Sequence, residues 1–382
     1  MIKGIKLAVI NVIYIFLLRM SDPNKSDTYV LIMAGGVGSR FWPKSRNNFP
    51  KQFIDILGTG KSLLQMTYDR FLAICPPENI FILSNNQYIE LIQEQLTSLP
   101  AGNIIAEPCR NNTAPCIAFA SFKISSLNPN AKIVVAPSDH LILNEPVFIE
   151  KVTACLDYIE NHDALLTLGI HPTRPDTGYG YINYKTELED GVFKVNRFHE
   201  KPNLETAKHF LNEGGYLWNA GIFIWRVSSI LSALSEYVPE IYTIFEQGKD
   251  HYNTQTETDF ISINYPLSPN ISIDYAIMEK ATNVYTIPGD FGWSDLGTWA
   301  SLYEVLDRDE DNNAFAGQSA DLTDTTNCII QIPNDKVAVI KGLDNFIVVD
   351  DGKVLLIYPK ADEQEIKEVS KIIVNQCGET FA

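Results

Sequence analysis

Residues 29–54 read Y-V-L-I-M-A-G-G-V-G-S-R-F-W-P-K-S-R-N-N-F-P-K-Q-F-I. An apolar run typical of a buried strand leads directly into a turn that contains three glycines. The residues after this turn carry four cations and no carboxylate, although the whole chain has a formal charge of −17. Exposed backbone N–H groups combined with positive side chains are typical of phosphate-binding sites. The stretch therefore predicts a polyphosphate site directly after the first strand.

Strand and helix signals alternate through the first half of the chain. Short apolar runs predict strands at 29–34, 80–84, 103–106, 133–137 and 164–169. Amphipathic patterns predict helices at 62–73, 87–96, 115–126 and 148–161. The alternation indicates an α/β fold, a Rossmann-like domain with a mainly parallel, doubly wound sheet. Ligands bind such sheets at the carboxyl ends of strands, where the glycine turn and residues 137–140 both lie.

The second half of the chain differs in composition. Strands that carry aromatic residues are expected at 179–184, 192–200 and 218–226. Short strands are then expected at 328–332, 337–340, 346–349 and 354–358, followed by a helix at 362–374. We therefore divide the chain into an N-terminal extension (1–28), a main domain (29–311) and a β-rich C-terminal arm (312–382).

The N-terminal extension allows three interpretations. Its apolar run, residues 7–18, is shorter than the roughly 20 residues that a membrane helix needs. Residues 19–23 offer no small-residue cleavage site for a signal peptide. We favour translation that begins at Met20, with a genuine extension or weak membrane tether, or a cleaved signal, as alternatives. No stable membrane insertion is expected.

Composition excludes several functional classes. The chain is 45% hydrophobic and 20% charged, as is common for soluble enzymes. Its negative charge argues against binding to nucleic acid or anionic membranes. The six cysteines show no C-x-x-C spacing, so we expect reduced thiols and a cytoplasmic location.

Two familiar nucleotide-binding motifs are excluded. Residues 36–41 begin like a dinucleotide fingerprint, but Phe41 stands where the third glycine is needed. Residues 60–62 end like a P-loop, but Asp55 stands where its first glycine is needed. The phosphate site predicted above must therefore belong to another class.

Longer motifs identify that class by resemblance. A-G-G-V-G-S-R-F-W-P-K-S followed by P-K-Q-F resembles the signature of sugar-1-phosphate nucleotidyltransferases, and in particular of mannose-1-phosphate guanylyltransferases. The resemblance continues in the family's order through E-P-C-R-N-N-T-A-P (107–115), P-S-D-H (137–140), G-Y-G-Y-I (178–182), F-H-E-K-P (198–202), W-N-A-G-I-F (218–223), S-I-D-Y-A-I-M-E-K (272–280) and G-W-S-D-L-G-T-W (292–299). One departure is Asn111, because relatives usually carry arginine before the Asn112-Thr113 pair; a contact by Arg110 is therefore not assigned.

The resemblance implies that GTP and mannose 1-phosphate react to give GDP-mannose and pyrophosphate. An oxygen of the sugar phosphate attacks the α-phosphorus of GTP in line. Both substrates are anionic, and two unit charges ~4 Å apart repel by about 4 kcal/mol at an effective dielectric near 20. Catalysis is therefore expected to come from positioning and charge neutralisation, without a protein nucleophile.

The resemblance also implies roles for individual residues. The catalytic cations are Arg40 as a bidentate fork, Lys51 as a mobile point charge, and Lys201 on the attacking phosphate. The nucleotide site comprises Ala34, Gly35, Gly36, Gly38, Ser39, Asn112 and Thr113. The sugar site comprises Gly180, Glu200 and Asn219. Asp139 and Asp295 are expected to hold Mg²⁺, which is the implied cofactor.

Structural alternatives stay open for some of these residues. Asp139 and Asp295 could each cap a helix, and Glu200 with Lys201 could form a solvent-facing salt bridge. For Lys44 and for Arg46, contact with substrate and exposure to solvent are equally expected. A lone His140 is expected to pack or orient a neighbour rather than bind a metal.

Functional alternatives are also open. The chain could use another base or hexose 1-phosphate, or it could be a non-catalytic nucleotide-sugar sensor. Some longer relatives carry a fused isomerase domain for which this sequence has no room, so we expect only the transferase step. By resemblance the C-terminal arm packs against the main domain and helps to form a homodimer.

Overall fold

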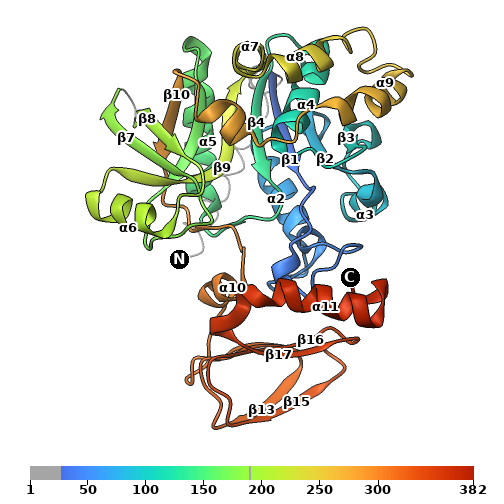
Figure 1. Ribbon diagram of the computed structural model, residues 1–382, viewed down its shortest axis with the longest axis vertical. Helices are drawn as coiled ribbons and strands as arrows, with labels where there is room; N and C mark the ends of the chain where they lie inside the picture. Colours follow the sequence, from blue (N-terminus) through green and yellow to red (C-terminus); the bar gives the residue numbers. More distant parts are fainter. Residues whose placement is uncertain (1–26, 189–190) are drawn as a thin grey trace, which may run out of the picture.

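The computed structural model describes residues 27–188 and 191–382 (Figure 1). The apolar run at 7–18, to which the three interpretations of the N-terminal extension refer, lies outside the described residues. Within the part that is described, none of the helices combines the length and the apolar character needed to cross a bilayer.

A nine-stranded sheet forms the centre of the main domain, in the order β3-β2-β1-β4-β9-β6-β10-β8-β7. Its strands are β1 (Thr28–Met33), β2 (Ile80–Asn85), β3 (Ile104–Glu107), β4 (Lys132–Pro137), β6 (Leu165–Ile170), β7 (Tyr181–Glu187), β8 (Phe193–His199), β9 (Tyr216–Arg226) and β10 (Val284–Pro288). The strands expected from the sequence are present, and β10 was not expected.

The α/β class is confirmed, but the sheet is mixed, whereas we predicted a mainly parallel one. Strands β1 to β4 pair in parallel. Strand β9, however, runs antiparallel to both β4 and β6, and β8 runs antiparallel to β7 and β10. The apolar runs in the sequence indicated these strands, but a run of buried residues carries no information about strand direction.

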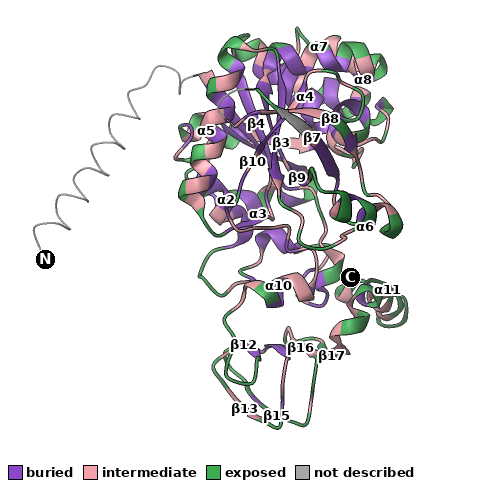
Figure 2. Cartoon of the chain, turned by 90° about the vertical axis from the view of Figure 1, so that its left-hand side faces the viewer, coloured by how far each residue is buried: buried purple, intermediate pink, exposed green. Residues whose placement is uncertain are grey.

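Helices cover both faces of the sheet (Figures 1 and 2). Alternate residues of β1 divide between two cores, with Leu31 in one and Val30 and Ile32 in the other. The core around Leu31 includes α4 (Thr113–Leu127), α7 (Val227–Tyr237), α8 (Pro239–Glu246) and α9 (Glu257–Asn264). The opposite core includes α2 (Leu63–Phe71), α3 (Ile89–Gln95) and α5 (Glu145–Asn161). A smaller cluster packs α6 (Leu204–Glu213) on β7 and β9.

The C-terminal residues form two small sheets and a helix. The sheets pair in the orders β12-β14-β16-β17 and β13-β15. Their strands are β12 (Ala314–Ala316), β13 (Ser319–Thr323), β14 (Ile329–Gln331), β15 (Val337–Lys341), β16 (Phe346–Asp350) and β17 (Leu355–Pro359). Helix α11 (Ile366–Cys377) lies between these sheets and the main domain (Figure 1).

The stretch that follows β1, residues 34–53, is called here the signature segment, and it packs against the C-terminal residues. Its Phe41 and Trp42 share an apolar core with Trp299, which begins α10 (Trp299–Val305), and with C-terminal strand residues. Trp42 Nε1 donates to the carbonyl of Phe381 at 2.9 Å. Arg46 pairs with Asp351. Arg46 therefore anchors the C-terminal segment to the signature segment.

Gly169 offers a test of the packing between β6 and its two neighbours. A Cβ added there would lie 2.5 Å from Leu217 Cδ1 and 2.9 Å from Thr286 Oγ1. Because Gly169 is flanked by β9 and β10, the backbone cannot move away. We expect Gly169→Ala to lower the free energy of unfolding by about 1–3 kcal/mol in urea titrations.

Gly102→Ala is the matched control, because a Cβ at Gly102 would meet no atom within 4 Å. The control is expected to change the unfolding free energy by less than about 0.5 kcal/mol. Equal stability of the two variants would show that the β6–β9–β10 packing is looser than described.

Candidate active site

A cavity of about 300 Å³ lies where the signature segment faces the end of β4. It is lined by Gly38, Ser39, Arg40, Phe41, Lys51, Asp139, His140, Asp295, Gly297 and Lys367. Two short antiparallel strands, β5 (Leu141–Ile142) and β11 (Trp293–Ser294), bring the two aspartates together. Ser294 pairs with Leu141, so the residues that follow β11 lie beside those that precede β5. Arg40, Lys51, Asp139 and Asp295 therefore face one space.

Lys51 is the most constrained cation of this cavity. Its side chain is only 4% exposed. The ammonium donates to Asp139 Oδ2 at 2.8 Å and to the carbonyl oxygens of Asp295 and Leu296 at 2.9 Å each. These acceptors use all three N–H groups that a lysine ammonium has. We expected a mobile point charge at Lys51, and the structure instead fixes it as a tie between the two aspartate-bearing segments.

The electrostatics around Asp139 follow from this tie. Burial by itself raises the pKa of Asp139, but the charge and hydrogen bond of Lys51 lower it, so that the pKa lies below its usual value. Asp139 is therefore ionised at neutral pH. Arg40 differs from Lys51, because it is exposed and makes no hydrogen bond or ion pair with the described residues.

Neither aspartate caps a helix. Asp139 is followed by strand β5, and the next helix, α5, is capped by Asn144. Helix α10 is capped by Thr298, whose side chain accepts a bond from the backbone of Ser301. Asp295 Oδ1 instead accepts from the Tyr179 hydroxyl at 2.8 Å and from the Gly297 backbone at 3.0 Å. Both helix-cap alternatives are therefore wrong.

His140 has a defined orientation. The indole N–H of Trp293 donates to His140 Nδ1 at 3.1 Å. An indole nitrogen can only donate, so Nδ1 accepts and any ring proton lies on Nε2. Burial lowers the pKa of His140, which agrees with a neutral ring. Packing and orientation, as expected for this lone histidine, describe its contacts.

A second cavity, of about 220 Å³, adjoins the first. Its lining includes the predicted sugar-site residues Gly180, Glu200, Lys201 and Asn219, together with Asp274. His140 and Asp295 line both cavities, so the two spaces meet at these residues. A Cβ at Gly180 would lie 2.6 Å from Glu200 Oε2, so a larger residue there would displace the Glu200 carboxylate.

Glu200 and Lys201 form an ion pair of 2.6 Å that faces solvent on the lysine side only. The Glu200 side chain is 5% exposed, and the Lys201 side chain is 59% exposed. Asn219 is held by protein groups: its Oδ1 accepts from Thr167 at 2.8 Å, and its Nδ2 donates to Asp274 at 2.9 Å. Glu200 therefore lies against the cavity wall, while Asn219 links β9 to Asp274.

The residues predicted for the nucleotide separate into groups. Gly38 and Ser39 line the first cavity, and Thr113 lines the second. Among described residues, neither lining includes Ala34, Gly35, Gly36 or Asn112. The glycine turn is nevertheless fixed, because Gln52 Nε2 donates to the carbonyls of Ala34 and Gly36 at 3.0 and 2.9 Å.

The departure at Asn111 also has a structural explanation. Its amide donates to the backbone carbonyl of Ser268 at 2.9 Å, so it serves to hold the residues after α9. Arg110 donates to the Tyr88 hydroxyl at 3.0 Å. Asn112 is the N-cap of α4 and has a positive φ of 69°, and its side chain accepts a hydrogen bond from the backbone N–H of Thr113.

Comparisons with known proteins agree with this geometry. The Nucleotidyl transferase family model matches residues 29–312. A mannose-1-phosphate guanylyltransferase of Klebsiella pneumoniae is 36% identical over 352 residues, which cover 90% of this chain and 73% of that protein. One of Salmonella muenchen is 35% identical over 346 residues, covering 89% and 72%.

The chain belongs to the nucleotidyl transferase family, in its mannose-1-phosphate guanylyltransferase branch. A solved structure is also similar: a Thermus thermophilus protein described as mannose-1-phosphate geranyltransferase. Its TM-score is 0.82 at 28% identity, with 91% of this chain and 99% of that chain covered. The similarity to this solved structure therefore extends beyond the part matched by the family model.

Three residues near the site were not assigned from the sequence. Tyr179 and Asp274 lie within motifs that carried the resemblance, so their position was a usable signal. Asp274 begins a short π-helix (Asp274–Met278), a local irregularity that is frequent at functional sites. Lys367 lies outside every quoted motif, and nothing in its local sequence could have indicated it.

Asp274 is expected to make the stability of the protein depend on pH. Burial and the nearby Glu200 raise the pKa of Asp274 to about 7, against the opposing charge of Lys201 and the hydrogen bond from Asn219. The folded state therefore holds a proton that the unfolded state releases near pH 4. Stability consequently falls as the pH rises from about 4 to about 7, by at most about 1.4 kcal/mol per pH unit.

Asp274→Asn resembles the protonated carboxyl and does not titrate, so it removes this dependence of stability on pH. We expect the stability of the variant, relative to the unsubstituted chain, to increase across that pH window and to level off above it. Urea unfolding of both chains at several pH values measures the difference. Parallel stability curves would contradict the raised pKa.

Proposed function

We propose that this chain transfers GMP from GTP to mannose 1-phosphate and releases pyrophosphate. The observation that carries the proposal is the meeting of two cavities at Asp295. One cavity presents Arg40, Lys51 and the signature turn, which suit a polyphosphate. The other presents Glu200 and Lys201, which suit a phosphorylated sugar. Two anionic substrates held in these spaces would meet beside the aspartates.

Asp139 and Asp295 fit a divalent cation by their chemistry. Carboxylate oxygens are the ligands that Mg²⁺ prefers, usually one or two of them with water and phosphate oxygens. Described residues include no set of three or more His, Cys, Asp and Glu that could enclose a metal without substrate. Such an open pair agrees with a Mg²⁺ ion shared with phosphate. When bound, the ion would neutralise phosphate charge at the reacting phosphorus.

The protein groups would contribute positioning and charge. Arg40 is exposed and unpaired among described residues, so its fork is available to phosphate oxygens. Lys51 is buried in the cavity wall, and its positive charge favours the ionised form of Asp139. Backbone groups of Gly35, Gly36 and Gly38 are proposed to approach the nucleotide, as expected for a glycine turn.

On the sugar side, Lys201 would hold the attacking phosphate. Its exposed ammonium is paired with Glu200 at 2.6 Å, so a cation and a carboxylate lie side by side at the sugar site. Glu200 would accept hydrogen bonds from sugar hydroxyls. Gly180 would leave room for that contact, and Asn219 would keep Asp274 and the Gly180 backbone in place.

The cellular setting is also part of the proposal. Free thiols are found at Cys109, Cys116, Cys155, Cys328 and Cys377, which supports a reducing compartment such as the cytoplasm. The division into a main domain and a C-terminal arm near residue 311, and the homodimer, stay predictions.

A substrate matrix tests the function directly. Pyrophosphate release is measured with GTP, UTP, ATP and dTTP against mannose 1-phosphate and glucose 1-phosphate, with Mg²⁺. We expect the highest kcat/KM for GTP with mannose 1-phosphate, by at least tenfold. Greatest activity with UTP and glucose 1-phosphate would assign a different transferase. Nucleotide-sugar binding without turnover in any combination would favour a sensor.

A further inference from the structure

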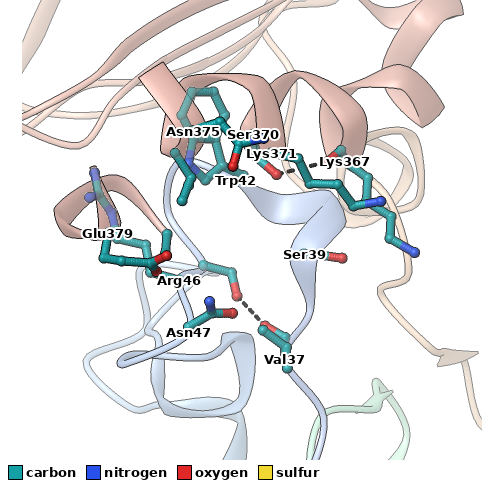
Figure 3. A pocket seen from close by; sticks show the side chains of 13 residues that line it. Val37, Ser39, Trp42, Arg46, Asn47, Lys367, Ser370, Lys371, Asn375 and Glu379 are labelled. Carbon is teal, nitrogen blue, oxygen red and sulfur yellow. Dashed lines mark hydrogen bonds between the residues drawn. The ribbon is translucent and has the colours of Figure 1, made fainter. Parts of the chain in front are cut away.

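A third cavity, of about 420 Å³, lies between the signature segment and helix α11 (Figure 3). Helix α11 packs on the short turn of helix that contains Ser39, Arg40 and Phe41. The C-terminal residues hold this arrangement, because Arg46 donates to the Thr380 carbonyl at 2.7 Å and the Asn47 backbone donates to Ala382 at 3.1 Å. Helix α11 therefore covers the short helical turn that directly follows the glycine turn.

Two lysines of α11 lie near the signature segment, because they line the same cavity as Ser39. Lys367 and Lys371 are one helical turn apart and share a face (Figure 3). Both line the third cavity, but Lys367 alone also lines the cavity of Arg40, Asp139 and Asp295. Lys371 is paired with Glu368 at 2.8 Å, whereas Lys367 has no ion pair with any described residue.

The charges of the active-site cavity make Lys367 significant. Lys51 has committed its three donors to protein oxygens. Of the cations that line this cavity, Arg40 and Lys367 can therefore bind a phosphate oxygen without breaking a contact with another described residue.

We propose that Lys367 binds the terminal phosphates of GTP, which become the pyrophosphate leaving group. This inference rests on the proposed function and assigns a further residue to its nucleotide site. Lys367 does not line the cavity of Gly180, Glu200 and Asn219, so the sugar phosphate is not its partner. The residue lies outside the region matched by the family model, which ends at 312.

Binding of GTP and GMP to the full chain separates this role from a structural one. Titration calorimetry is performed with Mg²⁺ on the unsubstituted chain and on Lys367→Ala, with Lys371→Ala as the matched control. We expect Lys367→Ala to weaken GTP binding by about tenfold, because one charge-assisted contact is lost. GMP lacks the terminal phosphates, so its affinity stays within about twofold. Lys367→Arg retains most of the GTP affinity.

Three results would overturn the inference. These are unchanged GTP affinity in Lys367→Ala, equal losses for GTP and GMP, or the same loss in Lys371→Ala. Because binding is measured without the sugar phosphate, failure here is distinct from failure of the substrate matrix. A chain that turns over GTP and mannose 1-phosphate but shows one of these results keeps its proposed function and loses this assignment.

Discussion

The site depends on one buried ammonium group. Lys51 joins the signature segment to Asp139 after β4 and to the backbone of Asp295 and Leu296 after β11. These three segments are distant in sequence, and each carries a group that the proposed reaction needs. Without a cation at this position, the ionised Asp139 would face the carbonyl oxygens of residues 295 and 296 with no positive charge between them. Fixing such groups before substrate arrives reduces the reorganisation needed during reaction.

The surrounding fold supports this tie from two sides. The β5–β11 pairing sets the register that brings Asp295 beside His140. The apolar core of Phe41, Trp42 and Trp299 fixes the signature segment against the C-terminal strands. The C-terminal segment thereby packs on residues 39–41, which directly follow the glycine turn. We infer that it contributes to nucleotide binding through Lys367 in addition to packing.

Much of the fold, but less of the site, could be predicted from sequence. The apolar run before the glycine turn and the run before Asp139 indicated β1 and β4, because buried strands have a clear pattern. The antiparallel direction of β9 could not be predicted, since direction depends on how the chain returns to the sheet. The convergence of Arg40, Lys51, Asp139 and Asp295 followed from the resemblance. The role of Lys51 did not, because its acceptors include backbone carbonyls 244 and 245 residues away. Lys367 reaches the site only through tertiary packing.

The most direct test is the stability of Lys51→Met without ligand, measured by urea unfolding. We expect a loss of roughly 3 kcal/mol, because Asp139 and two carbonyls lose their buried partner. Lys61→Met, which breaks the exposed pair with Asp69, is the control and should leave the stability nearly unchanged. A Lys51→Met chain that is as stable as the control, yet cannot bind GTP, would show that Lys51 contacts substrate instead of holding the site together.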